Sequence, residues 1–506
     1  MKLSVVVADA HVTLAAQALA LVARENMLEP QEDPFYQPPE GWESKEVGTI
    51  LRTRKVQMKT LVEENPKEAW QLLYRTTYRT EDEPTTTVTT VMVPHNAQND
   101  TLVMFGDFED TGAPECAPSY TWRAGLTSDV SSIANVAIAM LYLQEGYIVT
   151  MPDKEGKKGA FASGHVEGRQ SLDGIRATLA FDKIGLKKEA KVVGHGYSGG
   201  GIQTGWTAAL KKTYAPEINT VGWVTGGTPT NLTALVERIN KGPFAGYVAG
   251  GLTGLRSTYP EVKAYTDKVF TKEGRKDMAY PKEHCQVEVV LHFGFKDFFD
   301  KRISTNGKGY LYEAVVQKAL EEMTMGTKKE YTPDTPVLMA HGVADEIAPY
   351  EAAHKTYEAW SKNGGEVEFL RYENALAGHV GIYATSSVPG FLWNRERLQG
   401  KRVEGGCREY KNYDVGVNTK ALGEEFETTL KVLKGLMGDK IGPNDEYMRD
   451  AVHKREREGE RRERREAGRE GNRGGEIEEN KKKHRRGGRE REKGTSEGRK
   501  KDRQSI

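Results

Sequence analysis

The chain has 506 residues, of which 29% are charged and 37% hydrophobic, and its formal net charge is zero. This composition is that of a soluble protein, and the length allows one large domain with an insertion, or two or three domains. No run of 18 apolar residues occurs, so we predict no membrane span. The three cysteines show no CxxC pair or metal-binding spacing, and we expect no metal and no cofactor.

The N-terminal residues 1–29 have the features of a degenerate secretory leader. Met1 and Lys2 precede an apolar stretch, but Asp9 and His11 interrupt it. Residues 30–42, rich in proline and aromatic residues, are expected to form an extended arm on the domain surface. Three antiparallel β segments are then predicted at 46–59, 69–77 and 85–93, the last rich in β-branched residues.

From residue 102 onward, strands and helices alternate. Strands are predicted at 102–108, 147–151, 190–193 and 219–225, and helices at 131–145, 171–184 and 202–210. This alternation predicts parallel crossovers and a doubly wound, mostly parallel α/β sheet. We assign residues 30–230 to the first part of this core.

The rhythm breaks at residues 231–325, where we predict short helices at 232–239, 260–270 and 309–322, with 287–293 ambiguous. We interpret this block as a helical cap inserted into the core, and a second independent domain is the alternative. The core resumes over 326–445, with strands at 336–342 and 367–372 and helices at 350–362 and 420–437.

The C-terminal residues 446–506 differ in composition from the rest of the chain. Residues 451–506 hold 21 Lys and Arg against 13 Asp and Glu, so a basic segment follows an acidic body. So few apolar residues cannot offset the entropy cost of ordering, and we predict a disordered tail. The acidic body resembles no nucleic-acid-binding face, and we expect no nucleic-acid partner; binding of nucleic acid by the tail is an alternative.

The sequence Gly196-Tyr197-Ser198-Gly199-Gly200 follows the strand at 190–193 and precedes a helix. A serine between glycines at a sharp strand-to-helix turn is the nucleophile elbow of α/β-hydrolases. A glycine-rich turn in an ordinary βα unit is the alternative. A second G-x-S-x-G match, at 494–498, lies in the charged tail with no strand before it.

Acyl transfer by serine also needs a base and a carboxylate that orients the base. Asp345 and His379 follow later predicted strands, and Ser198, Asp345 and His379 have the α/β-hydrolase chain order. Glu346 is the alternative carboxylate, whereas His195 and His341 are expected to be buried structural histidines. The backbone N–H of Gly199 is one predicted oxyanion donor, and Asp110, after the strand at 102–108, is the other.

These motifs resemble the fungal secretory lipases of the lipase A type, over about residues 32–440. The resemblance implies a secreted serine lipase with an α/β-hydrolase core and a helical lid, with the residues above as triad and oxyanion hole. It also implies a Cys116–Cys285 disulfide and leaves Cys407 unpaired. The segments that carry it are 33–39, 48–52, 109–110, 116–120, 152–156, 172–177, 196–200, 226–229, 341–342 and 345–346.

We therefore expect a secreted enzyme that hydrolyses triacylglycerol or other lipid esters at an oil–water or membrane interface. A soluble-ester carboxylesterase, an acyltransferase and a catalytically silent binding protein of the same fold remain alternatives. Secretion makes Asn99 and Asn231, each in an N-x-T triplet, candidate glycosylation sites.

Overall fold

A computed structural model describes residues 27–58, 66–124, 131–373, 378–403, 406–411 and 413. Residues 1–26 of the expected leader, the helix expected at 420–437 and the charged segment 446–506 lie outside the described residues. Within the described part, no helix is both long enough and apolar enough to cross a bilayer.

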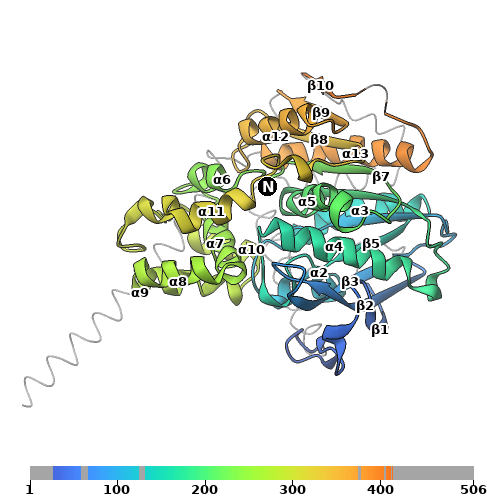
Figure 1. The fold of residues 1–506 in the computed structure, drawn as a ribbon, viewed down its shortest axis with the longest axis horizontal. Helices are drawn as coiled ribbons and strands as arrows, with labels where there is room; N and C mark the ends of the chain where they lie inside the picture. Colours follow the sequence, from blue (N-terminus) through green and yellow to red (C-terminus); the bar gives the residue numbers. More distant parts are fainter. Residues whose placement is uncertain are drawn as a thin grey trace, which may run out of the picture. The chain divides into compact units, whose positions relative to one another are not determined.

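The described residues form one ten-stranded mixed sheet with the strand order β1-β2-β3-β5-β4-β6-β7-β8-β9-β10 (Figure 1). Pairing is antiparallel from β1 to β5 and parallel from β5 to β10. The bounds are β1 Ile50–Val56, β2 Glu68–Thr77, β3 Pro84–Val93, β4 Thr101–Gly106, β5 Ile148–Pro152, β6 Lys191–Tyr197, β7 Thr220–Gly226, β8 Val337–Gly342, β9 Val367–Tyr372 and β10 Arg408–Tyr410.

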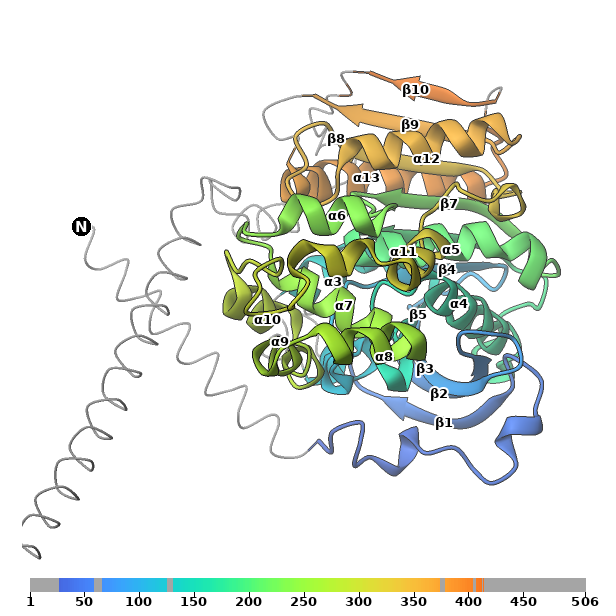
Figure 2. The ribbon, with the colours of Figure 1, turned by 60° about the vertical axis from the view of Figure 1, so that its left-hand side comes forward.

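Helices cover both faces of the sheet, as the predicted doubly wound α/β architecture requires (Figure 2). Side chains alternate along each strand, so Leu102 and Met104 of β4 enter one apolar cluster and Val103 and Phe105 enter another. The first cluster packs against α4 Gly164–Leu179, α5 Ser198–Tyr214 and α12 Tyr350–Lys362. The second packs against α3 Ser131–Gln144 and α13 His379–Leu398.

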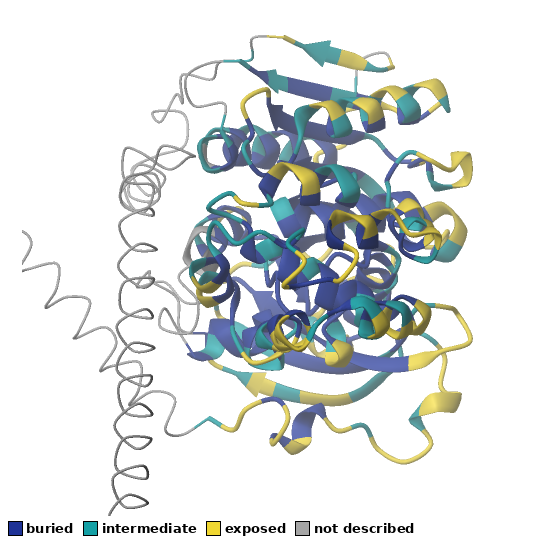
Figure 3. Ribbon diagram, turned by 90° about the vertical axis from the view of Figure 1, so that its left-hand side faces the viewer, coloured by how far each residue is buried: buried dark blue, intermediate teal, exposed yellow. Residues whose placement is uncertain are grey.

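The segment between β7 and β8 is helical, as expected, and its helices gather beside one end of the sheet (Figures 1 and 2). Their buried residues continue the first apolar cluster of the core. Figure 3 shows exposed residues mainly on the outer faces of the elements and buried residues toward the sheet. The helices are α6 Leu232–Ile239, α7 Gly246–Thr258, α8 Pro260–Val269, α9 Lys272–Asp277, α10 Gln286–Phe293 and α11 Ala314–Glu322.

The N-terminal arm lies on the sheet, as expected, although it is not extended throughout. It forms 3₁₀ turns at Pro34–Tyr36 and Trp42–Ser44. Phe35 and Tyr36 pack against Leu73 and Val88 of the sheet. These contacts anchor the chain before β1, which is shorter than the predicted 46–59.

The predicted helix at 171–184 has the wrong bounds. Helix α4 begins at Gly164 and ends at Leu179, and a separate 3₁₀ turn follows at Asp182–Ile184. Glycine disfavours helix interiors, but a Cβ at Gly164 would lie 1.9 Å from the Trp206 ring of α5. Close packing of two helices therefore outweighs propensity at this position.

Several elements escaped prediction. Helix α13 contains Pro389, and α7 contains four glycines, so both lack the usual helical signals. The short helix α2, Pro118–Ala124, and strand β10 were also missed. The ambiguous stretch at 287–293 is helix α10.

Candidate active site

Ser198 is the first residue of α5, at the sharp turn where β6 ends. Its φ is +52°, the left-handed region that is strained for a residue with a side chain. A Cβ on Gly196 would lie 2.0 Å from the Gly200 carbonyl oxygen, and one on Gly200 would lie 2.2 Å from that of Gly106. The turn therefore needs glycine on both sides of the serine, as the elbow motif predicts.

Ser198, His379 and Asp345 come from three separate elements and form one chain of hydrogen bonds. His379 Nδ1 lies 2.8 Å from Asp345 Oδ2, and His379 Nε2 lies 2.8 Å from Ser198 Oγ. A carboxylate can only accept, so Nδ1 carries the proton and Nε2 accepts from the serine hydroxyl. The three residues named from the sequence are thus brought together.

Asp345 follows β8, and the backbone of its loop holds the carboxylate through the oxygen that does not face His379. Asp345 Oδ1 accepts from the backbone N–H groups of Ile347 at 2.9 Å and Ala348 at 2.7 Å. His379 follows β9, as predicted, and is the first residue of α13. Tyr197 Oη donates to the His379 carbonyl oxygen at 2.5 Å and ties this helix start to the elbow.

The electrostatics of the pair favour charge on both partners. Burial alone would raise the pKa of Asp345, but the facing His379, its hydrogen bond and nearby His341 together lower it. Burial alone would lower the pKa of His379, but Asp345, and to a lesser degree Glu346 and Asp110, raise it above its usual value. An imidazolium formed at this position is therefore stabilised.

The other residues considered from the sequence have different contacts. Glu346 Oε2 accepts from the backbone N–H of His379 at 2.8 Å rather than from its ring. His341 Nε2 donates to the Ala348 carbonyl oxygen at 2.9 Å. His195 Nδ1 lies 2.7 Å from Tyr142 Oη, and burial lowers the His195 pKa to about 3. Both of these histidines are buried, as expected.

Asp110 and Gly199, the two residues predicted to supply oxyanion donors, are in contact. Asp110 is buried and also has a positive φ, +52°. A Cβ on Gly199 would lie 1.7 Å from Asp110 Oδ1, so only a glycine leaves room for this carboxyl group. The loop after β4 therefore places Asp110 directly against the first turn of α5.

Comparison with known proteins connects this geometry to a family. The model of the secretory lipase family matches residues 124–406, which include Ser198, Asp345 and His379. The chain belongs to the secretory lipase family. Secreted triacylglycerol lipase LIP2 of Malassezia globosa is 77% identical over 454 residues, which are 90% of this chain and all of the relative. Secreted triacylglycerol lipase LIP3 of the same organism is 75% identical, again over 90% of this chain and all of the relative.

Solved structures agree on the fold of this secretory lipase. Candida antarctica lipase A in its closed state has a TM-score of 0.73 at 29% identity, covering 80% of this chain and 96% of that one. The fold is thus that of an α/β-hydrolase. The esterase LipA of Xanthomonas oryzae, with a TM-score of 0.56 at 16% identity, covers 71% of this chain and 100% of its own, and shares the fold.

The secretory lipase contains the implied disulfide. Cys116 and Cys285 are bonded, which joins the loop after β4 to the start of α10. Thr111, in the same loop, contacts the carbonyl oxygens of Pro281 and His284. Cys407 is free, and its Sγ donates to the Gly365 carbonyl oxygen at 3.0 Å.

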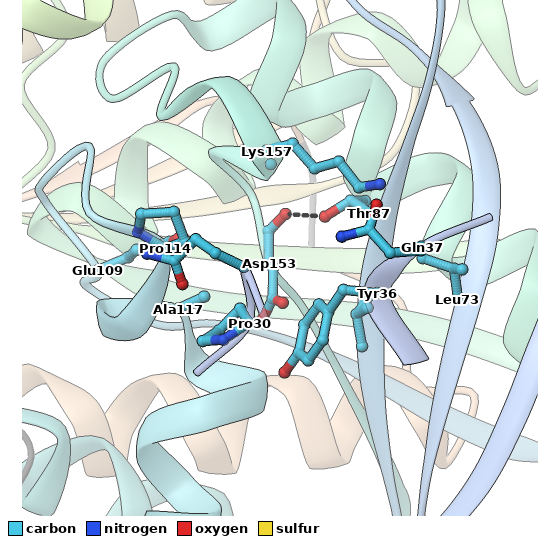
Figure 4. A pocket seen from close by; sticks show the side chains of 13 residues that line it. Pro30, Tyr36, Gln37, Leu73, Thr87, Glu109, Pro114, Ala117, Asp153 and Lys157 are labelled. Atoms are coloured by element: carbon cyan, nitrogen blue, oxygen red, sulfur yellow. Dashed lines mark hydrogen bonds between the residues drawn. The ribbon is translucent and has the colours of Figure 1, made fainter. Parts of the chain in front are cut away.

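A cavity of about 280 Å³ lies between the N-terminal arm, the sheet and the loops after β4 and β5 (Figure 4). Tyr36, Leu73 and Val88 give it an apolar wall, whereas Glu109 and Asp153 line it with carboxyl groups. Ser198, Asp345 and His379 are not among the residues that line it.

Sequence reasoning missed a group of buried charges behind Asp110. Lys154 and Glu155 follow β5, Glu167 lies on α4, and all three side chains are almost fully buried. The only signal was the run of three charged residues directly after a buried strand, Asp153 to Glu155. No cluster of metal-ligand residues occurs among the described residues.

Proposed function

We propose that this chain is a secreted triacylglycerol lipase that cleaves ester bonds through an acyl-enzyme on Ser198. The observation that carries the proposal is the continuous hydrogen-bond chain from Ser198 Oγ through the His379 ring to Asp345. Membership of the secretory lipase family and the activity named for its Malassezia relatives support it. No cofactor is needed, because each step uses side chains and water.

In acylation, Ser198 Oγ attacks the ester carbonyl carbon while His379 Nε2 takes the hydroxyl proton. Asp345 keeps Nδ1 protonated and stabilises the imidazolium. The resulting tetrahedral intermediate collapses when Nε2 gives the proton to the leaving alkoxide. A diacylglycerol would leave in this way from a triacylglycerol, and the acyl group would stay on Ser198.

Deacylation repeats these steps with water as the nucleophile. His379 takes a proton from the water, and the fatty acid leaves as Ser198 recovers its hydrogen. In both steps the carbonyl oxygen becomes negative, and we propose that the backbone N–H groups of Gly199 and Asp110 donate to it. Losing one such donor costs roughly 3 kcal/mol of transition-state stabilisation.

The helical segment 231–325 is proposed to act as a cap over this site. Two contacts support the assignment: Arg238 of α6 donates to the Asp345 carbonyl oxygen at 3.2 Å, and the Cys116–Cys285 bond joins the loop near Asp110 to α10. A cap that opens on a lipid surface would give the enzyme access to water-insoluble esters. In that case the rate should increase abruptly once the substrate exceeds its solubility.

The same proposal places N-linked glycans on the secreted protein, with Asn99 the better acceptor. Asn99 is exposed in the loop before β4. Asn231 instead uses its side-chain oxygen to cap α6, accepting from the Ala234 N–H at 2.9 Å. Peptide mass mapping of the secreted protein before and after glycosidase treatment tests both positions.

The central test is Ser198→Ala, measured on emulsified triacylglycerol and on p-nitrophenyl esters of increasing acyl length. We expect turnover of both to fall to background, since the substitution removes the hydroxyl that contacts His379 Nε2, and labelling by a fluorophosphonate probe to be lost. The Ser198→Ala variant should keep a cooperative unfolding transition like that of the wild type, which shows that it is folded. Turnover by the folded variant would overturn the proposal, and hydrolysis confined to short soluble esters would favour a carboxylesterase.

A further inference from the structure

One buried cation lies among several acidic side chains directly behind Asp110. Lys154 is 1% exposed, and its Nζ lies 2.9 Å from Glu155 Oε1, 3.7 Å from Asp110 Oδ1 and 3.9 Å from Glu167 Oε2. The ammonium also lies 5.2 Å from the centre of the Phe161 ring. These residues come from the loops after β4 and β5 and from α4, so the arrangement is a feature of the fold.

The cluster has more acidic groups than cations. Besides Lys154, the backbone N–H groups of Thr111 and Ala162 contact Glu155 and Glu167, respectively. Burial raises the pKa of Glu155 to about 8 and that of Glu167 to about 7, although Lys154 opposes both shifts. Burial and the neighbouring Glu155 raise the pKa of Glu109 well above its usual value. The cluster therefore keeps part of its protons at neutral pH. Burial alone would lower the pKa of Lys154, but the negative charge that remains on the surrounding acidic groups raises it, so Lys154 stays charged.

Asp110 connects this cluster to the serine. Its Oδ1 faces Lys154 on one side and packs against Gly199 on the other, at the position where a side chain on Gly199 would clash. A fully charged carboxylate at this position would repel the negative charge that develops on the substrate carbonyl oxygen. A cation behind it offsets that repulsion, and in a buried site the effect is much larger than in water.

We propose that Lys154 is a positioning residue of the oxyanion site, whose ammonium fixes the Asp110 carboxyl beside Gly199 and offsets the acidic charge behind it. The proposal rests on the proposed hydrolase function and extends it to a residue that does not touch the substrate. Lys154 acts on the transition state through Asp110, so it affects kcat and leaves KM unchanged.

The proposal also predicts a pH effect with a definite sign. The titratable groups around Lys154 and Asp110 are Asp107, Glu109, Asp153, Glu155 and Glu167, with His379 across the site. As pH rises through about 7 to 8, Glu167 and Glu155 lose protons. Negative charge then accumulates behind Asp110, and kcat should decline on the alkaline side. Glu167→Gln removes one of these charges and should move that decline to higher pH.

The direct test is Lys154→Met, measured with a soluble p-nitrophenyl ester. We expect kcat to fall roughly tenfold to a hundredfold with KM nearly unchanged. Lys211→Met is the matched control: Lys211 is also largely buried and pairs with Asp334 at 3.3 Å. It lies on α5 about 20 Å along the helix from Ser198. This control should lose stability and keep its kcat.

A double-mutant cycle with Asp110→Asn separates a role through Asp110 from a structural one. If Lys154 acts through Asp110, Lys154→Met should reduce kcat much less in the Asp110→Asn background than in the wild type. Equal fold losses in both backgrounds would overturn the proposal. If Lys154→Met does not fold, the dependence of kcat on pH in Glu167→Gln is the deciding measurement. A profile that superposes on that of the wild type would refute the proposal. Ser198→Ala separately tests the proposed function, which could hold while this inference fails.

Discussion

Removing the Cys116–Cys285 bond should lower the free energy of unfolding by about 5 kcal/mol. The two cysteines are 169 residues apart. Closing a loop of that length removes much of the unfolded chain's entropy, and the chain-entropy relation gives this value at 25 °C. A typical domain has only 5–15 kcal/mol in total, so Cys116→Ala with Cys285→Ala should lose a third or more of its stability.

The native contacts explain why the loss should arise mainly in the unfolded state. Gly112 N–H donates to the Pro281 carbonyl oxygen at 2.9 Å, and Thr111 contacts Pro281 and His284, so the two segments stay joined without the sulfur bond. The double variant should therefore remain folded at 25 °C. Its denaturant slope should rise, because the uncrosslinked unfolded chain exposes more surface.

Urea unfolding of the double variant, followed by tryptophan fluorescence, measures this difference. Cys407→Ser is the control, because that free cysteine makes one hydrogen bond to the Gly365 carbonyl oxygen, and its loss should cost no more than about 1 kcal/mol. A loss below about 1 kcal/mol in the double variant, with an unchanged slope, would refute the loop-entropy reasoning.

Further predictions concern the serine site. Asp345→Asn should lower kcat about 10⁴-fold by allowing the wrong His379 tautomer. The kcat/KM of the wild type should decrease as the pH falls, with a midpoint above the usual pKa of histidine, because the pKa of His379 is raised. In Asp345→Asn this midpoint should lie at lower pH, because the charge that raises the pKa is gone. The raised pKa also stabilises the folded protein at pH values below the unfolded-state pKa of His379, and this stabilisation is lost as the pH rises through the folded-state pKa. Measuring kcat/KM and the free energy of unfolding against pH tests both effects. Gly200→Ala should abolish activity or folding, because its Cβ would meet the Gly106 carbonyl oxygen, and normal labelling of Ser198 by a fluorophosphonate would contradict this.

The strands could be predicted from the sequence because their local signals agree with their environment. β3 is rich in threonine and valine and pairs with β2 along its full length, and β8 is an unbroken buried run. The serine, the aspartate and the histidine follow β6, β8 and β9, and parallel strands of a doubly wound sheet bring their carboxyl ends to one edge. Chain order and strand position were therefore enough to name the serine and the histidine and to narrow the carboxylate to Asp345 or Glu346.

The helices show where such reasoning fails. The four glycines of α7 gave no helical signal, but a Cβ at Gly254 would lie 2.1 Å from the Phe161 carbonyl oxygen, so this glycine permits close packing of the helix against a loop. Helix α13, which was not predicted, contains Pro389, a residue that local propensity places outside helix interiors. In each case a tertiary contact determines the structure, and a local propensity scale does not contain that information.

The choice between Asp345 and Glu346 illustrates a limit of a different kind. The two carboxylates are consecutive, and both contact His379: Asp345 accepts from the ring and Glu346 from the backbone N–H. His379 begins α13, and the positive end of the helix dipole disfavours an imidazolium there. Both carboxylates act against this effect, since each raises the His379 pKa. The two positions are equivalent in the sequence, and only the direction of each side chain decides which one orients the ring and which one accepts from the backbone N–H at the start of the helix.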